Sequence, residues 1–144
     1  MWRTWGEGGL LAAVLLNPST ADAAQDDPTL RAVMARARAA GLDGVRVANL
    51  FTLRSPDPRA LARVADPVGP GADAAIDRAV TGAALVLCGW GAGGRLMGRG
   101  AAVAARLAAA GVPLAHLGLT QGGEPRHPLY IRRDMPMQRW EVAR

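Results

Sequence analysis

Two amides and an imidazole are the side chains in this sequence best suited to chemistry. Asn17 follows the apolar run LLAAVLL, Asn49 stands late in the run GVRVANLF, and His127 lies beside Arg126 in the loop LTQGGEPRHPLY. Amides can hold a water molecule or read a hydrogen-bonding edge, and an imidazole can stabilise charge near neutral pH. Two simpler interpretations stay open, because Asn17 can cap the turn before Pro18 and Asn49 can satisfy backbone groups at a strand end.

Four apolar stretches predict the strands that would position these residues. They span residues 10–16, 44–51, 84–90 and 112–118. The helical patterns between them run from Asp27-Pro28, a cap followed by proline, to Gly41; from Asp57 to about Val64; from the turn-rich stretch 66–73 to about Ala79; and from Arg95 to Ala110.

The alternation of strands and helices indicates the fold class. Connections too long for hairpins predict a central, mostly parallel four-stranded sheet with helices on both faces, an α/β three-layer sandwich. Ligands of such sheets bind beyond the carboxyl ends of the strands. We therefore expect Asn17, Asn49, Trp90 and His127 to gather at one edge. The 144 residues suffice for a single domain, with its core over about residues 10–131 and a basic tail at 132–144.

The net positive charge of the chain comes entirely from its last third. All seventeen basic residues are arginine; residues 1–94 hold nine of them with nine acids, and residues 95–144 hold eight with three acids. Such a region suits a polyanion, although a GC-rich genome that encodes Arg in place of Lys explains the composition equally well. Cations early in the predicted 95–110 helix oppose its dipole, which is consistent with a phosphate-facing role, and a solvated face explains them at least as well. The phosphate-binding candidates are Arg95, Arg99, Arg126, Arg132 and Arg133.

Several classes of protein and site find no support. No apolar run approaches the roughly 18 residues of a membrane span, and the first residues lack a signal-peptide pattern. Cys88 is the single cysteine, so a reducing, cytoplasmic location is expected, with neither an internal disulfide nor zinc-ligand spacing. Motifs of acyl transfer and of P-loop phosphoryl transfer are absent, and without lysine no side chain can form a Schiff base. We expect no cofactor and no metal.

Two motifs have a simpler interpretation beside the functional one. Residues 89–94 spell G-x-G-x-x-G between a strand and a helix, but no acid follows at the distance a dinucleotide site requires, so a tight turn is favoured over nucleotide-cofactor binding. Asp22, Asp26 and Asp27 offer oxygen ligands for a divalent metal. A cap at Asp27 and an ordered loop explain the three acids more simply.

Four blocks in order, LNPSTADAAQDDPTLR, VANLFTLRSPDP, CGWGAGG and GEPRHPLY, resemble domain of unknown function family 1643, bacterial and phage proteins marked by an LNPSTAD sequence. The resemblance runs from about Leu10 to Tyr130. Members usually open with a longer segment than MWRTWGEGG, so an initial strand is expected to be short or missing here.

The same blocks are similar, more widely, to the uracil-DNA glycosylase superfamily. This resemblance implies a uracil-DNA glycosylase-like fold in which Asn17 positions the attacking water and Asn49 reads the base edge. Trp90-Gly91 would match a structural turn, and His127-Pro128 the loop that stabilises the departing base, with Leu129 or Tyr130 as a wedge. The catalytic set is Asn17, His127 and Asp22. The carboxylate is not implied by the resemblance: Asp22 or Asp26 supplies it if their loop folds back. The base- or ligand-binding set is Asn49, Pro18, Ser19, Phe51, Trp90, Gly91, Leu129 and Tyr130.

The expected function is hydrolysis of an N-glycosidic bond that removes a modified or damaged base from nucleic acid, DNA rather than RNA, by a monomeric protein. Such an enzyme stabilises the leaving base, holds a water on the opposite face and accepts a flipped nucleotide. The alternative is a module with a glycosylase-like fold that binds nucleic acid or a nucleotide without chemistry. The polar trio Asn17, Asn49 and His127 favours the enzyme, because a binding module needs only the arginines.

Overall fold

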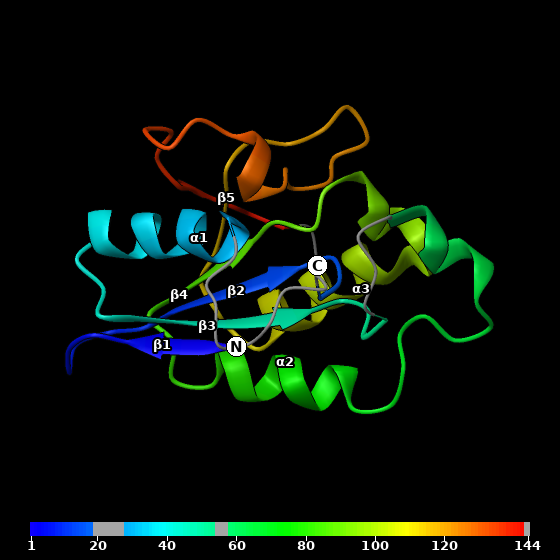
Figure 1. The fold of residues 1–144 in the computed structure, drawn as a ribbon, viewed down its shortest axis with the longest axis horizontal. Helices are drawn as coiled ribbons and strands as arrows, with labels where there is room; N and C mark the ends of the chain where they lie inside the picture. Colours follow the sequence, from blue (N-terminus) through cyan, green and yellow to red (C-terminus); the bar gives the residue numbers. More distant parts are fainter. Residues whose placement is uncertain (19–27, 54–57, 143–144) are drawn as a thin grey trace.

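A computed structural model describes residues 1–18, 28–53 and 58–142 (Figure 1). These residues form an α/β fold around one mixed sheet of six strands in the order β1-β3-β2-β4-β5-β6. The strands are β1 (Trp2–Thr4), β2 (Leu11–Leu15), β3 (Gly44–Asn49), β4 (Leu85–Cys88), β5 (Leu114–His116) and β6 (Gln138–Arg139). The four inner strands are the four predicted ones, and they run parallel. The α/β class is confirmed, but the expected number of strands is not, since β1 and β6 add an antiparallel strand at each edge.

Helices lie on both faces of the sheet. The α-helices are α1 (Pro28–Ala39), α2 (Ala72–Val80) and α3 (Arg99–Ala109), and the 3₁₀ segments are η1 (Pro58–Arg63), η2 (Ala92–Gly98) and η3 (Pro128–Tyr130). In α1 the buried residues include Leu30, Val33 and Ala37 on one face of the helix, and Met34 on the same face is partly buried. No helix in the described ranges is long and apolar enough to cross a membrane.

Strand β2 shows why the inner strands read as unbroken apolar runs. All five of its residues are buried. Leu11, Ala13 and Leu15 pack with α1, whereas Ala12 and Val14 belong to the cluster that includes α2 and α3. Because successive side chains of a strand point to opposite faces, a strand covered on both sides must be apolar at every position.

The predicted helix from Arg95 to Ala110 is wrong in its first turn. The α-helix begins at Arg99, and Arg95 lies in η2, separated from it by a kink. At the kink Leu96 has ψ 126° and Met97 takes a left-handed φ of 58°, and Gly98 follows at φ 63°. Arg95 and Arg99 therefore do not share one helical stripe.

The segment expected to be a basic tail is part of the fold. Strand β6 pairs with β5, and the Trp140 backbone N–H donates to the Leu114 carbonyl at 2.9 Å. The Trp140 ring packs 6.0 Å, centroid to centroid, from both Trp90 and His116. No apolar run marks this segment in the sequence, since β6 consists of two exposed polar residues.

This packing predicts a clear loss of stability for Trp140→Ala. A fully buried Trp typically contributes about 3–5 kcal/mol, and we expect about 2 kcal/mol for this half-buried one. The matched control is Trp2→Ala on β1, because Trp2 is 51 % exposed and its ring lies against the Arg46 guanidinium. This variant should cost less than about 1 kcal/mol. Chemical denaturation measures both, and equal losses would contradict a structural role for the C-terminal segment.

Candidate active site

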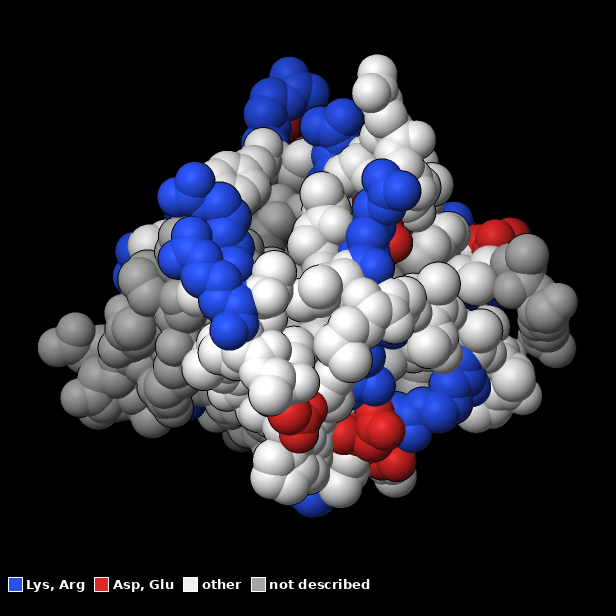
Figure 2. All heavy atoms as spheres, turned by 90° about the vertical axis from the view of Figure 1, so that its right-hand side faces the viewer, with Lys and Arg blue, Asp and Glu red and all other residues white. Residues whose placement is uncertain are grey.

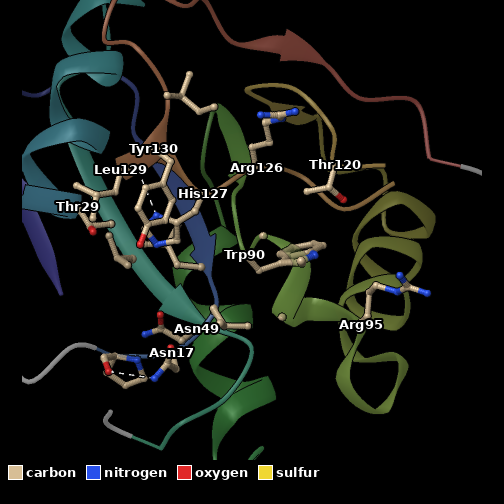
Figure 3. A pocket seen from close by; sticks show the side chains of 18 of the residues that line it. Asn17, Thr29, Asn49, Trp90, Arg95, Thr120, Arg126, His127, Leu129 and Tyr130 are labelled. Carbon is tan, nitrogen blue, oxygen red and sulfur yellow. Dashed lines mark hydrogen bonds between the residues drawn. The ribbon is translucent and has the colours of Figure 1, made fainter. Parts of the chain in front are cut away.

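A cavity of about 1080 Å³ lies at the carboxyl ends of the parallel strands (Figure 3). Its walls come from the ends of β2 and β3, the first turn of α1, the loop after β4, the turn at residues 120–122 and the segment 126–131. Strand β2 has β3 on one side and β4 on the other. The chain thus leaves the sheet centre in opposite directions at this point, which is where open α/β sheets usually bind ligands.

Asn17 ties the loop after β2 to the loop after β3. Its side-chain Nδ2 donates to the Leu53 carbonyl oxygen at 3.1 Å, and its contact with the adjacent Pro18 oxygen is long, at 3.5 Å. The donor side of this amide thus serves a contact between two loops more than a cap on its own turn. Oδ1 is the acceptor of the same group, and the residue lines the cavity.

Asn49 ends β3 opposite Leu15 and also lines the cavity. Its side-chain amide makes no hydrogen bond to any residue that the structure describes. The alternative that Asn49 satisfies neighbouring backbone groups therefore has no support within these residues. An amide at the cavity wall with both a donor and an acceptor can read the edge of a planar, hydrogen-bonding ligand.

His127 caps η3 with one nitrogen. The Leu129 backbone N–H donates to His127 Nδ1 at 3.2 Å, so the neutral imidazole carries its proton on Nε2. The ring lies 5.7 Å, centroid to centroid, from that of Tyr130, which is 82 % exposed. Leu129 and Tyr130 both line the cavity beside it, as Figure 3 shows.

Trp90 is buried beneath the cavity and fixes the loop around it. Its indole N–H donates to Glu124 Oε2 at 2.5 Å, and a β-carbon on Gly94 would collide with its ring. A β-carbon on Gly89 would lie 2.8 Å from Pro128 Cδ. The G-x-G-x-x-G sequence is thus a turn in which only glycine allows close packing, which is the simpler of the two interpretations.

The family model described as "Protein of unknown function (DUF1643)" matches residues 1–129. The chain belongs to the DUF1643 family. No curated protein and no solved structure matches it. The match covers most of the chain, and it contains every strand except β6.

The described parts of the four DUF1643 sequence blocks meet at the cavity. Asn17 comes from the first block, Asn49 from the second, Trp90 and Gly91 from the third, and His127 from the fourth. Pro18, Leu129 and Tyr130 also line the cavity, as do Arg95 and Arg126. Ser19, Asp22, Asp26 and Asp27 lie outside the described residues.

Other predicted residues are not at the cavity of this DUF1643 protein. Phe51 is fully buried in the core, because the chain turns inward after Asn49, so its assignment to ligand binding is corrected. Arg132 and Arg133 are exposed and do not line the cavity, and Arg132 faces Asp134 at 3.4 Å.

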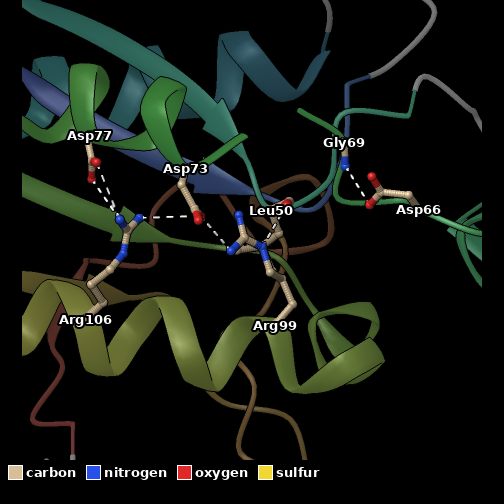
Figure 4. A network of polar contacts seen from close by, with 7 residues as sticks. All are labelled: Leu50, Asp66, Gly69, Asp73, Asp77, Arg99 and Arg106. Atoms are coloured by element: carbon tan, nitrogen blue, oxygen red, sulfur yellow. Dashed lines mark hydrogen bonds and ion pairs between the residues drawn. The ribbon is translucent and has the colours of Figure 1, made fainter. Parts of the chain in front are cut away.

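Arg99 is a structural residue and is removed from the phosphate-binding set. Its Nη1 lies 2.7 Å from Asp73 Oδ1 and its Nε donates to the Leu50 carbonyl at 2.9 Å, as Figure 4 shows. The neighbouring Arg106 lies between Asp73 and Asp77 at 3.7 and 3.2 Å. Two arginines of the basic third are thus paired with acids of α2, which a charge sum along the sequence does not reveal.

Arg36 binds the backbone of the 131–132 segment, next to the cavity lining, and this role was not predicted. It is 3 % exposed, and its Nη2 donates to the Arg132 carbonyl at 2.8 Å while its Nη1 donates to Ala32 at 3.1 Å. Burial, and secondarily the charge of Arg133, lowers the pKa of Arg36. In the sequence, its position on the buried stripe of α1 was the only sign of this role. Thr29 and Thr120 are further lining residues that were not predicted.

Acidic and metal-ligating groups are scarce at the site. Among the described residues, the cavity lining contains no Asp or Glu, and no group of three His, Cys, Asp or Glu side chains could hold a metal ion. Burial raises the pKa of the Cys88 thiol far above neutrality, so it is no thiolate nucleophile. The described groups are suited to hydrogen bonding and to binding anions.

The Arg99–Asp73 pair predicts a pH-dependent contribution to stability. The hydrogen bond from Arg99, aided by its charge and that of Arg106, lowers the pKa of Asp73 against the opposing effect of burial. A carboxylate with a lowered folded pKa stabilises the fold above its unfolded value, near 4, and loses this contribution as pH falls further. Asp73→Asn should therefore lower Tm at pH 7 and approach wild type near pH 3. The exposed Asp134→Asn is the control and should change little. A difference that stays constant with pH would exclude the ion pair as its cause.

The Glu124–Trp90 hydrogen bond predicts different effects on stability for two substitutions of Glu124. Glu124→Ala leaves the buried indole N–H without its partner, which costs about 1–3 kcal/mol. Glu124→Gln keeps an acceptor oxygen of similar reach and should retain most of the stability. Thermal unfolding, followed by tryptophan fluorescence, compares the two variants. Equal destabilisation would show that the charge, not the hydrogen bond, matters at this position.

Proposed function

We propose that the protein hydrolyses the N-glycosidic bond of a modified or damaged base in nucleic acid, as a DNA glycosylase-like enzyme. The observation that carries this proposal is the convergence of Asn17, Asn49 and His127, from three separate segments, on one cavity. A purely structural origin would not require two amides and an imidazole at the same place. The lack of lysine fits hydrolysis without cleavage of the strand.

Each of the three residues has one task in the proposed reaction. Asn49 binds the edge of the base, His127 donates from Nε2 to the base as negative charge develops, and Asn17 accepts a hydrogen bond from water through Oδ1. The bond between sugar C1′ and the base nitrogen breaks with its electron pair leaving on the base. The water oxygen then bonds to C1′ and its proton passes to solvent or to the released base.

The resemblance to the uracil-DNA glycosylase superfamily supports the proposal. The four matched segments occur in the implied order, and the strands that bear them are the parallel centre of the sheet. We propose that the uracil-DNA glycosylase-like sandwich describes this centre, with β1 and β6 as additions at its edges. The nucleic-acid partner, the monomeric state and the cytoplasmic location belong to the same proposal.

A second candidate is a module that binds nucleic acid or a nucleotide without chemistry. The observation that favours it is the absence of a carboxylate from the described lining, since an amide orients water but cannot remove its proton. The two candidates make different predictions for base release and the same prediction for binding.

The test incubates the protein with oligonucleotides that carry uracil, hypoxanthine or modified pyrimidines and detects abasic sites by alkaline cleavage. His127→Asn is the sharpest variant, because an Asn side chain can still accept from the Leu129 N–H and cap η3 but lacks Nε2. It should lower the rate about 10²–10³-fold, as should His127→Ala. Asn17→Ala should reduce the rate about 10²-fold.

Exposed Arg63→Gln, outside the cavity lining, is the control for nonspecific effects and should leave the rate unchanged. Full activity of His127→Asn would exclude the assigned role of Nε2. Binding without base release from any substrate would favour the non-catalytic module.

A further inference from the structure

Two arginines that line the cavity face no acid among the described residues. Arg95 on η2 and Arg126 after β5 both line the cavity and are exposed. Arg126 Nε donates only a long bond, 3.4 Å, to the Leu119 carbonyl, and neither guanidinium has a carboxylate partner among the described residues. Arg99, Arg106 and Arg132, in contrast, each lie within 4 Å of an Asp. The two cavity arginines are thus available for an anion.

Backbone lies close to both arginines. A β-carbon on Gly122 would lie 3.1 Å from Arg95 Nη1, and one on Gly118 would lie 3.4 Å from Arg126 Cδ. Residues 118–122 therefore lie beside both side chains, and Thr120 and Gln121 of the same turn add polar groups to the lining. Guanidinium groups bind phosphate through paired hydrogen bonds.

Another part of the cavity wall suits a planar base. In Figure 3, Asn17 and Asn49 lie on the other side of Trp90 from Arg95. Arg126 lies apart from Arg95, and His127 and Tyr130 lie together on a third side. Asn49 offers a donor and an acceptor that no described residue uses, and the His127–Tyr130 ring pair offers an apolar surface. The volume of about 1080 Å³ is at the upper end of ordinary ligand sites and exceeds what a base alone needs.

We infer that the cavity binds one nucleoside monophosphate unit, with its phosphate at Arg95 and Arg126 and its base against Asn49 and His127. This inference deepens the proposed function and rests on the same site. The unit is either a free nucleotide or a nucleotide within a strand. A base alone would leave both arginines unused, and a polyanion alone would leave Asn49 unused.

The distribution of charge supports a small number of phosphate contacts. Figure 2 shows the arginines on the displayed face as separate groups with uncharged surface between them, not as one continuous band. For a nucleic-acid strand, two phosphate-binding arginines predict that log Kd changes with log salt concentration with a slope of only about 1.4–1.8, whereas a duplex-wide interface with 6–10 contacts gives a far steeper slope.

The test compares binding of the common nucleosides, their 5′-monophosphates and single-stranded oligonucleotides of the same bases by calorimetry. The wild type should bind at least one monophosphate at least about tenfold more tightly than its nucleoside. Arg95→Gln and Arg126→Gln should each remove most of this difference, and the double variant all of it. Asn49→Ala should weaken nucleoside and monophosphate equally, and Arg63→Gln should change neither.

Equal affinity for nucleoside and monophosphate, or a difference that survives in the double variant, would overturn the inference, as would the absence of binding to every probe. Tighter binding of oligonucleotides than of monophosphates, by more than about tenfold, identifies a strand as the source; the reverse identifies free nucleotides. The proposed function fails separately: nucleotide binding with this pattern but no base release leaves the inference standing. If the double variant releases the base with an unchanged KM, the inference is wrong and the proposed function stands.

Discussion

The packing around the indole of Trp90 is the constraint on which the cavity depends. The ring is 1 % exposed and has no room for a side chain at Gly94 or Gly100, so η2 and the start of α3 approach it through backbone. Glu124 accepts its N–H, and Trp140, the residue after β6, packs against its ring. Residues 92–100, Glu124 and Trp140 are thereby held around one side chain.

The loop that carries His127 is positioned through this same packing. The Gly91 N–H donates to the Pro125 carbonyl at 2.7 Å, directly before Arg126, and Gly89 lies against Pro128. A larger residue at position 89 would displace the loop and with it the imidazole. The glycines after β4 therefore help to set the position of His127, because they allow the 125–128 loop to pack closely.

The parts of the fold that could be predicted are those whose burial is visible in the sequence. The inner strands are covered on both faces, so β2 and β4 are apolar runs bounded by turn residues. The edge strands β1 and β6 are short and largely exposed, and their composition does not differ from that of a loop. Their pairing depends on distant partners, which no local pattern encodes.

For the site, topology was predictable and side-chain direction was not. Asn17 and Asn49 meet because parallel strands end at one edge, a consequence of chain order alone. Phe51 stands two residues beyond Asn49 and points into the core, and Arg99 pairs with an acid of α2. Both outcomes depend on how the elements pack, so motif membership and charge sums assigned these residues incorrectly.

The groups that line the cavity limit its chemistry. Amides, an imidazole, hydroxyls and two guanidinium groups face it, with no carboxylate in the described lining. Without a carboxylate to remove a proton from water, the proposed hydrolysis would depend on early departure of the base as an anion, stabilised by His127. Bases that already carry electron-withdrawing groups leave most readily in this way. Phosphate bound at Arg95 and Arg126 would hold the sugar in place while charge develops on it, and Asn17 would keep the water oriented until C1′ becomes electrophilic. On this reasoning the arginines would raise the rate by holding the sugar in place, and Asn17 would raise it by keeping the water oriented. Neither group acts on the departing base, so selectivity among bases would follow mainly from how stable each base is as a leaving group.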